Sequence, residues 1–352
     1  MTSTALAAAS PQVTSDTGRT RLVTGLTASG RLHIGNYVGA VRPLLDLAAA
    51  GTTQAVCFVA DLHAMTTEHD PGRLREHTRE LAATLLACGL GDDATLFLQS
   101  AVPAHTELAY LLECTAAYGE MTRMIQFKEK AGRERSSARL SLLTYPALMA
   151  ADILLYRADV VPVGDDQRQH LELTRTLARR FNARYGDVFV VPSSAVPPAA
   201  ARLRDLRVPT AKMGKSTSSK AGGTGILHLL DDPVRIAATV RAAVTDLDPS
   251  LSYDPELRPG VANLADLLGA LTRRTPQAAL EGLRGAGALK AAVTEALVET
   301  LGPIRARYLA LLDDPAGLDR RLAAGAATAA GLAAPTLAAA REAMGLMPAA
   351  AG

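Results

Sequence analysis

The sequence predicts an α/β protein in which a doubly wound parallel sheet is followed by an all-helical domain. From Arg21 onward, short runs rich in β-branched residues alternate with longer segments of helical periodicity, which is the pattern of a parallel sheet with crossover helices. Beyond Ile226 the chain is rich in alanine and leucine and keeps a helical pattern to its end. A length of 352 residues agrees with two domains of ordinary size.

Four segments have the composition of strands, and the last three of them are apolar enough to be buried on both faces. We expect these strands at residues 21–27, 55–61, 95–99 and 159–163. Periodicity predicts helices at about residues 37–50, 71–88, 105–118, 145–157 and 166–182. The expected organisation is a flexible tail at residues 1–19, an α/β domain at 20–225 and a helical domain at 226–352.

Composition is typical of a soluble globular protein. The chain has 37 basic and 35 acidic residues, a net charge of +2, so a polyanion would have to meet a local patch rather than the whole surface. Hydrophobic residues make up 48% of the chain. We expect no apolar run long enough to cross a bilayer. Cys57, Cys88 and Cys114 lack the spacing of a zinc site or a disulfide framework, and the first residues do not resemble a secretion signal. We therefore expect a cytoplasmic protein without a protein-bound metal.

The segment after the first strand has the properties of an anion-binding turn. It runs through Gly25, Gly30 and Gly35 into a helix, where backbone N–H groups and the helix dipole favour a phosphate. His33 could add a proton donor to a phosphoryl oxygen. The glycines alone would fit a simple tight turn equally well. We call residues 27–36 the histidine turn.

A second segment, residues 209–220, places Lys212 and Lys215 in a stretch rich in serine, glycine and lysine. Flexible lysines are suited to closing on a polyphosphate and to stabilising the charge of a departing pyrophosphate. A solvated basic loop is the simpler interpretation of this segment by itself. We call it the lysine loop. Residues 121–139 and 202–220 each hold six basic residues, against two and one acidic residues, and are the basic patches available to RNA.

Together these motifs resemble those of a known family. His33-Ile34-Gly35-Asn36 resembles the HIGH motif, and Lys212-Met213-Gly214-Lys215-Ser216 resembles the KMSKS loop, of class I aminoacyl-tRNA synthetases. Residues 126–130, 143–156, 161–167 and 243–246 are similar to the bacterial tryptophanyl branch of that family. The resemblance spans about residues 21–345. It implies a Rossmann-like catalytic domain with a mobile lysine loop, followed by a helical anticodon-binding domain.

The resemblance also implies a reaction and its partners. The chain would activate L-tryptophan with ATP, forming tryptophanyl-adenylate and pyrophosphate, and then transfer the amino acid to tRNA(Trp). Mg²⁺ would accompany ATP without a dedicated protein cage, and an insertion in the catalytic domain would form a homodimer. Neither a membrane nor DNA is an expected partner. The alternatives are tyrosyl specificity, another adenylyltransferase with a HIGH-type motif, and a non-catalytic relative that binds RNA or a partner protein.

The resemblance assigns site residues position by position. The residues expected to act in catalysis are His33, Asn36, Lys130, Lys212, Lys215 and Ser216. Those expected to bind ATP are Thr27, Ala28, Ser29, Gly35, Asn36, Gly164, Asp165, Asp166, Leu203, Lys212, Met213, Gly214, Lys215 and Ser216. Those expected to bind tryptophan are Gly25, His63, Tyr145, Met149, Asp152, Ile153 and Gln167. Thr27-Ala28 in place of Gln-Pro, and Gly214 in place of serine, depart from the family pattern on the ATP side.

The residues themselves point to a single acceptor in the amino-acid pocket. Tyr145, Met149, Asp152, Ile153 and Tyr156 share one face of a predicted helix, which makes an apolar wall with one carboxylate. Indole offers one N–H donor and no acceptor, so Asp152 suits tryptophan better than tyrosine. The alternatives are an ion pair of Asp152 with Arg157 or Arg123, a packed loop position for His63, and helix capping by Asp165 or Asp166.

Overall fold

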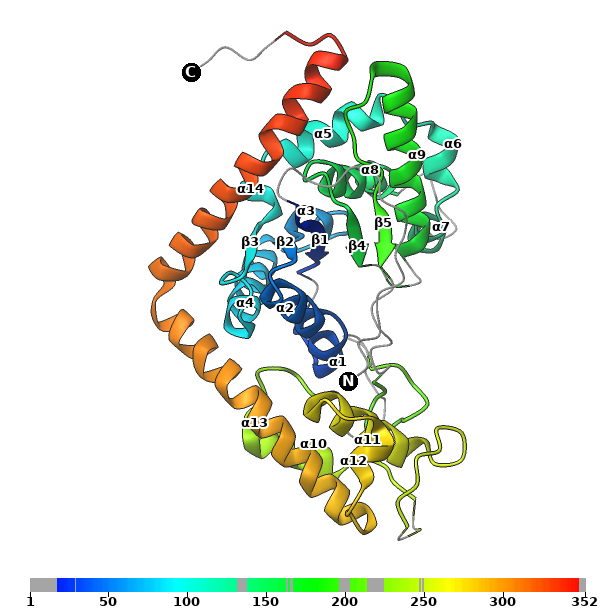
Figure 1. Cartoon of the computed structure of the whole chain (residues 1–352), viewed down its shortest axis with the longest axis vertical. Coiled ribbons are helices and arrows are strands. Elements are labelled where there is room, and N and C mark those ends of the chain that lie inside the picture. Colours follow the sequence, from blue (N-terminus) through cyan, green and yellow to red (C-terminus); the bar gives the residue numbers. More distant parts are fainter. Residues whose placement is uncertain are drawn as a thin grey trace.

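A computed structural model of the chain describes residues 18–28, 30–131, 138–162, 164, 167–195, 203–213, 225–246, 248 and 250–347, with the backbone only at 129–131 and 195. Within these residues a parallel sheet of five strands has the order β3-β2-β1-β4-β5 (Figure 1). The strands are β1 (Thr20–Leu26), β2 (Thr53–Val59), β3 (Ala94–Leu98), β4 (Val160–Pro162) and β5 (Ser193–Ala195). The predicted α/β class with a parallel sheet and helical C-terminal part is confirmed.

The four predicted strands are confirmed to within two residues, and β5 was missed. β5 has only three residues, Ser-Ser-Ala, and pairs with β4 through Val160↔Ser193 to Pro162↔Ala195. A short edge strand without an apolar run carries no strand signal in the sequence. It is recognised only because β4 provides its hydrogen-bonding partner.

The helices of the α/β part overlap the five predicted segments, and the short helices at residues 61–64 and 125–131 were not predicted. The helical segments of this part are α1 (Ile34–Asn36), a π-helical turn (Tyr37–Val41), α2 (Arg42–Ala49), α3 (Asp61–Ala64), α4 (Pro71–Cys88), a 3₁₀ turn (Gln99–Ala101), α5 (Ala104–Glu113), α6 (Tyr118–Thr122), α7 (Ile125–Ala131), α8 (Leu140–Leu154) and α9 (Arg168–Tyr185). The helix predicted at residues 105–118 is wrong at its end, because α5 stops at Glu113 and α6 starts anew at Tyr118. Helix α8 begins five residues before the predicted start and ends before Tyr156.

Helix α4 shows why some bounds are predictable. Asp70 accepts a hydrogen bond from the backbone N–H of Arg73 at 2.8 Å, which caps the N-terminus. Gly89 takes the left-handed conformation, with φ of 107°, just after the last helical residue. Both signals are local in the sequence, and the predicted range is the observed one.

Alternate residues of the central strands point to opposite faces of the sheet and join two hydrophobic cores. Leu22 of β1 lies in one core and Val23 in the other. The first core is completed by residues of α2, α4, α11 and α13, and the second by residues of α5, α8, α9 and α14. The sheet is therefore covered on both faces, as a buried parallel sheet requires.

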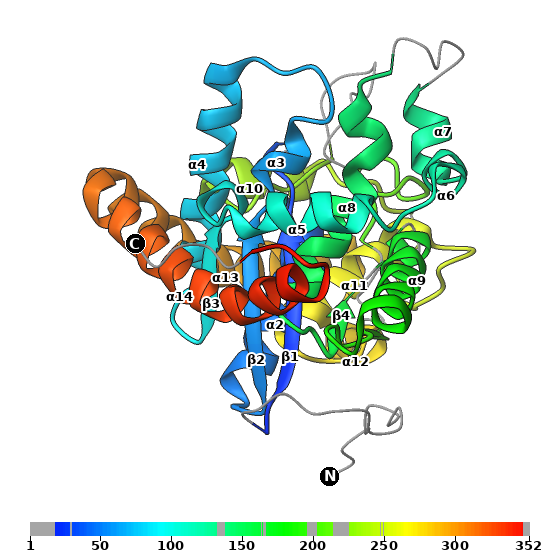
Figure 2. The same cartoon turned by 90° about the horizontal axis from the view of Figure 1, so that it is seen from above.

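The chain ends in helices α10 (Pro233–Arg241), α11 (Pro259–Thr272), α12 (Pro276–Leu280), α13 (Gly285–Asp313) and α14 (Pro315–Ala343). Helix α13 packs against α4, α10 and α11. Helix α14 runs along the β3 edge of the sheet, while α9 lies at the β4–β5 side (Figures 1 and 2). By length and composition α14 could cross a membrane, which the composition did not lead us to expect, but here it lies against β3 and α5.

The contact between α14 and β3 depends on a glycine. A Cβ on Gly325 would stand 1.9 Å from the carbonyl oxygen of Leu96 in β3, so only glycine allows this approach. Ion pairs also join this helix to the α/β part, through Arg321 to Asp92 at 2.8 Å and Asp319 to Arg79 at 2.5 Å. The helix thus covers an edge strand that would otherwise expose its backbone.

We expect Gly325→Ala to lower the free energy of unfolding by about 1–3 kcal/mol, because α14 must move away from β3. Gly331→Ala in the same helix is the matched control, since nothing lies within 4 Å of its Cβ position. That substitution should raise stability by up to about 1 kcal/mol through helix propensity. Urea denaturation of both variants tests the difference, and equal changes would contradict the close contact.

Candidate active site

The topology places a switch point of the sheet at the carboxyl ends of β1 and β4. The chain order of the sheet reverses between these two strands, and ligands of open α/β sheets bind at such a switch point. The histidine turn follows β1, and the turn with Gly164 and Gln167 follows β4. The backbone N–H of Gln167 donates to the carbonyl of Gly164 at 3.0 Å, just ahead of α9.

The histidine turn has a defined internal geometry. His33 is 6% exposed, and its backbone N–H donates to Oδ1 of Asn36 at 3.1 Å. A Cβ on Gly35 would stand 3.0 Å from the His33 ring, so the glycine lets the imidazole fold back over the start of α1. A Cβ on Gly25 would stand 2.5 Å from the ring of Phe58. Asn36 and both glycines therefore have structural roles in addition to those the resemblance implies.

The segments on either side of the lysine loop are joined to the histidine turn. After the loop, the N–H of Ile34 donates to Leu227 at 2.8 Å, and the N–H of Leu229 donates to Leu32 at 3.0 Å. Before the loop, Leu203 has its Cβ 3.9 Å from the Cβ position of Gly35. Residues of both motifs were expected to bind ATP, and the described segments on either side of the lysine loop lie against the histidine turn.

Lys212 is held by its backbone next to this contact. It forms an isolated antiparallel bridge with Arg204, and the N–H of the following residue, Met213, donates to Leu203 at 3.2 Å. Met213 is buried and Lys212 is exposed. The first lysine of the loop therefore projects from a backbone that is fixed against the histidine turn.

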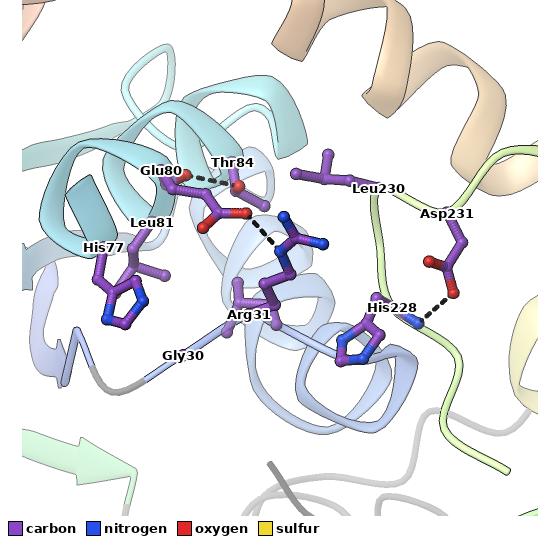
Figure 3. A pocket seen from close by; sticks show the side chains of 10 residues that line it. Gly30, Arg31, His77, Glu80, Leu81, Thr84, His228, Leu230 and Asp231 are labelled. Carbon is purple, nitrogen blue, oxygen red and sulfur yellow. Dashed lines mark hydrogen bonds and ion pairs between the residues drawn. The ribbon is translucent and has the colours of Figure 1, made fainter. Parts of the chain in front are cut away.

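A small cavity of about 40 Å³ lies beside the histidine turn (Figure 3). Its lining includes Arg31 of the turn, Glu80 of α4, and His228 and Asp231 ahead of α10. Nε of Arg31 pairs with Glu80 at 3.0 Å, and the backbone N–H of His228 donates to Asp231 at 2.9 Å. A volume of this size holds one or two water molecules, so the cavity is too small to be the substrate pocket. It lies where three segments of the chain meet.

A larger hollow of about 660 Å³ opens at the opposite edge of the sheet. It is lined by the amino ends of β2 and β3, including Thr53 and Ala94, and by Arg321 of α14. Parallel sheets bind their substrates at the carboxyl ends of the strands. We therefore place the candidate site at the carboxyl ends of β1 and β4 and not in this hollow.

Asp152 of α8 is the buried carboxylate of the candidate amino-acid pocket. It is 2% exposed and accepts three hydrogen bonds. Oδ1 accepts from Nε2 of Gln99 at 2.7 Å and from Nδ1 of His105 at 2.6 Å, and Oδ2 accepts from Nε2 of His63 at 2.8 Å. The alternative of an ion pair with Arg157 or Arg123 is wrong for the residues that the structure describes, because these three side chains supply the donors.

The donors of Asp152 come from the segments that follow β2 and β3, and His105 lies in the first turn of α5. His63 lies in α3, directly after β2, and Gln99 starts the 3₁₀ turn after β3. Asp61 joins the two loops, since its Oδ1 accepts from the backbone N–H of Ser100 at 3.0 Å and its Oδ2 from the Ser100 hydroxyl at 2.5 Å. His63 is thus packed in a short helix beside Asp152, and its contact with tryptophan stays a prediction. Gln99 and His105 were missed.

The hydrogen bonds set the charge of the site. Burial alone would raise the pKa of Asp152, but the hydrogen bonds from His105 and His63 outweigh it and lower the pKa to about 2. Because a carboxylate only accepts, Nδ1 of His105 and Nε2 of His63 carry the protons. The Tyr156 hydroxyl lies 2.8 Å from Nε2 of His105 and extends this network. Asp152 is therefore an anion held by the side chains of Gln99, His105 and His63.

Other predicted tryptophan-binding residues lie along the same helix. Tyr145 is half-buried, and its hydroxyl lies 2.6 Å from Nε2 of His170 and 3.4 Å from Gln126; burial raises its pKa to about 12. Ile153 is 3% exposed and Met149 is half-buried. Tyr156, predicted on the helix, lies just beyond its end and is fully buried. The wall predicted from spacing is therefore formed by α8 and the turn after it.

Several predicted site residues fall outside the described part of the chain. Side-chain positions are not described for Ser29, Lys130, Asp165, Asp166, Gly214, Lys215 and Ser216. Thr27 and Gly164 are described and exposed, and Ala28 is buried. Their assignments stay predictions.

The depressed pKa of Asp152 predicts a pH dependence of stability. A carboxyl whose pKa is lower in the folded state contributes stability above its ordinary pKa and loses it as the pH falls toward the folded value. Between pH 4 and pH 2 the unmodified chain should therefore lose about 2 kcal/mol more unfolding free energy than Asp152→Asn. Urea unfolding at several pH values measures this. Parallel pH profiles of the two proteins would show that Asp152 is not an anion in the fold.

Comparisons with known proteins agree with this geometry. Residues 15–302 match the family described as tRNA synthetases class I (W and Y). The chain is 49% identical over 333 residues to tryptophan–tRNA ligase 1 of Streptomyces avermitilis, which covers 94% of this chain and 99% of that protein. The crystal structure of tryptophanyl-tRNA synthetase from Mycoplasma pneumoniae has 35% identity and a TM-score of 0.80, and covers 94% of this chain and 98% of that one. The synthetase from Campylobacter jejuni, complexed with ADP and tryptophan, has 30% identity and a TM-score of 0.78, and covers 93% and 100% of the two chains. The chain therefore belongs to the class I tRNA synthetase family of tryptophan and tyrosine enzymes.

Proposed function

We propose that this chain is a tryptophan–tRNA ligase, which activates L-tryptophan with ATP and transfers it to tRNA(Trp). Two relatives from Streptomyces, each 49% identical to this chain over 333 residues, are named tryptophan–tRNA ligase 1. The observation that carries the proposal is the buried anion of Asp152, which has donors on three of its acceptor positions. A carboxylate offers about four such positions, and an indole N–H is the donor that would complete the set.

The surroundings of Asp152 favour a donor over an acceptor on the substrate. Oε1 of Gln99, which is fully buried, has no hydrogen-bond partner among the described residues. It belongs to the amide that donates to Asp152, so a second acceptor accompanies the carboxylate. A tyrosine hydroxyl can both donate and accept, whereas the indole nitrogen only donates. Tyrosyl specificity is accordingly the weaker candidate.

Catalysis requires the protein to orient the reacting groups and to stabilise the charge that develops on the phosphates. In the first step the tryptophan carboxylate attacks the α-phosphate of ATP in line and pyrophosphate leaves. We assign His33 and the backbone of the histidine turn to the phosphates, and Lys212, Lys215 and Lys130 to the charge that develops on pyrophosphate. In the second step a terminal ribose hydroxyl of the tRNA attacks the carbonyl carbon of the adenylate, an ester bond forms, and AMP leaves.

Mg²⁺ would arrive with the nucleotide. Among the described residues no group of three or more His, Cys, Asp or Glu side chains could hold a metal ion. Mg²⁺ commonly keeps its waters and binds substrate phosphates, so ATP itself would supply the ligands. When bound, the ion would neutralise charge on the departing phosphates.

The partners beyond ATP and tryptophan are also proposals. We assign anticodon recognition to residues 226–352, catalysis to residues 20–225, and acceptor-strand contacts to the basic patches at 121–139 and 202–220. Four large apolar side chains are exposed on the neighbouring helices α5 to α8, namely Tyr110, Tyr118, Ile125 and Leu140. We propose that they contribute to a homodimer interface, because exposed apolar side chains that gather in one area mark interaction sites. Light scattering of the purified chain would test the dimer. A cytoplasmic location is a separate proposal.

One assay tests the function directly. Exchange of pyrophosphate into ATP should depend on L-tryptophan and on none of the other nineteen amino acids, and tRNA(Trp) should then be charged. Exchange with tyrosine alone would favour tyrosyl specificity. If the chain shows no exchange but binds L-tryptophan, the non-catalytic alternative is favoured. Binding can be followed by the fluorescence of the bound L-tryptophan, because the chain itself contains no tryptophan.

A further inference from the structure

A buried carboxylate, Asp205, lies at the base of the lysine loop. It is 3% exposed. Its Oδ1 accepts from the backbone N–H groups of Arg207 at 2.7 Å and Val208 at 3.0 Å, which precede the loop. Its Oδ2 accepts from the backbone N–H of Gly225 at 3.2 Å, which follows the loop. One side chain thus joins the chain on both sides of the loop.

Backbone hydrogen bonds near Asp205 also join the two sides of the lysine loop. The N–H of Leu206 donates to the carbonyl of Gly225 at 3.0 Å, and the N–H of Asp205 donates to Ala211 at 3.0 Å. A Cβ on Gly225 would stand 2.2 Å from Oδ1 of Asp205 and 2.4 Å from the nitrogen of Arg207. Only glycine therefore lets the outgoing chain reach the carboxylate.

The same segment is anchored to both parts of the protein. Asn263 of α11 is 4% exposed. Its Oδ1 accepts from the N–H of Arg204 at 2.9 Å, and its Nδ2 donates to the Arg204 carbonyl at 3.0 Å. On the other side, Leu203 meets Gly35 of the histidine turn. Asp205 lies between these two anchors, one residue from the partner of Lys212.

We propose that Asp205 is a positioning residue that fixes the two ends of the lysine loop and so sets where Lys212 stands relative to the histidine turn. Burial of a carboxylate is costly unless hydrogen bonds replace its water, and among the described residues the donors to Asp205 are backbone groups at the base of the loop. This inference rests on the proposed function, because the lysines act on the phosphates of ATP.

The proposal predicts a separation of kinetic constants. The tryptophan pocket is formed by α8 and by the loops after β2 and β3, none of which contains Asp205. Loss of Asp205 should leave the dissociation constant of tryptophan within about twofold. Because a displacement of about 1 Å can cost about 10²-fold in rate, the kcat of pyrophosphate exchange should fall about 10- to 100-fold, and the KM for ATP should rise.

The experiment compares three variants of the full chain with two controls. Asp205→Ala removes all three hydrogen bonds, and Asp205→Asn keeps one acceptor oxygen but places an amide group opposite a backbone donor. Gly225→Ala breaks the same contact from the other side. Asp254→Ala is a matched control, because Oδ1 of Asp254 accepts from the N–H groups of Glu256 and Leu257 in the same way but touches neither side of the lysine loop. Gly287→Ala, in open space on α13, controls for the glycine substitution.

Rates are normalised to the concentration of tryptophan-binding sites, so a merely unfolded fraction does not count as a loss of kcat. The expected result is a similar loss of kcat in all three variants, with normal tryptophan binding and unchanged controls. Variants that bind tryptophan and match the unmodified chain in kcat and in the KM for ATP would overturn the role of Asp205. A loss of tryptophan binding in parallel with kcat would also overturn it, by showing a general structural role. If the unmodified chain itself shows no exchange with tryptophan, the proposed function fails, and the inference fails with it.

Discussion

Asp152→Ala should lower kcat/KM for tryptophan activation by about 10²-fold, since a hydrogen bond to a charged group contributes about 1.5–3 kcal/mol and its loss also disorders the pocket. The substitution removes the anion that organises His63, His105 and Gln99, and the three donors are left without their common acceptor. The dissociation constant of L-tryptophan should rise, which its own fluorescence measures because the chain has no tryptophan.

Specificity distinguishes binding by Asp152 from a loss of folding. A site built around a hydrogen bond can reject analogues without the donor by about 10⁴–10⁵-fold. The unmodified chain should therefore discriminate strongly against 1-methyltryptophan, which lacks the indole N–H, and Asp152→Ala should discriminate little. Asp266→Ala is a suitable control, because Asp266 is a half-buried carboxyl that accepts from Tyr253 at 2.9 Å in α11. If Asp152→Ala still activated tryptophan normally, Asp152 would not contact the substrate.

The fold was predictable because its signals are local. The buried strands are continuous apolar runs, and α4 carries its cap at Asp70 and its stop at Gly89. β5 lacks such a signal, and the break between α5 and α6 lies in a segment without proline or a strong helix stop at residues 114–117. What the sequence could not predict are features that depend on a neighbouring element.

The partners of Asp152 illustrate the same limit in the candidate site. Spacing along α8 placed Asp152 on the wall with Tyr145 and Met149, because residues on one helix face are related by a fixed period. His63, Gln99 and His105 are 89, 53 and 47 residues away, and no period connects them. The available signal was chemical. A buried carboxylate requires donors, and polar residues at the carboxyl ends of buried strands are the ones that can reach it.

Asp205 shows how counting charges can conceal a structural residue. Residues 202–220 were interpreted as a basic patch with one acidic residue. That residue is buried and bonded to the backbone of Arg207, Val208 and Gly225, so its role lies in the structure at the base of the loop. Its role became visible only when Gly225 was placed beside it in space.

Lys212→Ala should lower the kcat of pyrophosphate exchange by about 10²–10³-fold, which is the usual effect of removing one group that stabilises developing charge. The backbone of Lys212 forms a bridge with Arg204, so the side chain extends from a fixed backbone position. The dissociation constant of tryptophan should be unchanged, because no part of the α8 pocket is altered. Lys212→Arg should recover only part of the rate, since the planar guanidinium differs in shape and reach. Arg75→Ala, which removes an exposed cation from α4, should exchange at the normal rate.

Combining Lys212→Ala with Asp205→Ala tests whether the two residues act on the same step. If Asp205 works by positioning Lys212, the double variant should lose little more than Lys212→Ala alone, since the position of an absent ammonium group no longer matters. Independent effects would instead multiply, as they do for separated sites. Lys215 also belongs to the loop, so some additional loss from Asp205→Ala is expected even without Lys212. A normal rate for Lys212→Ala in single-turnover adenylate formation would show that Lys212 does not stabilise the departing pyrophosphate. The other lysines of the loop would then be the candidates for that role.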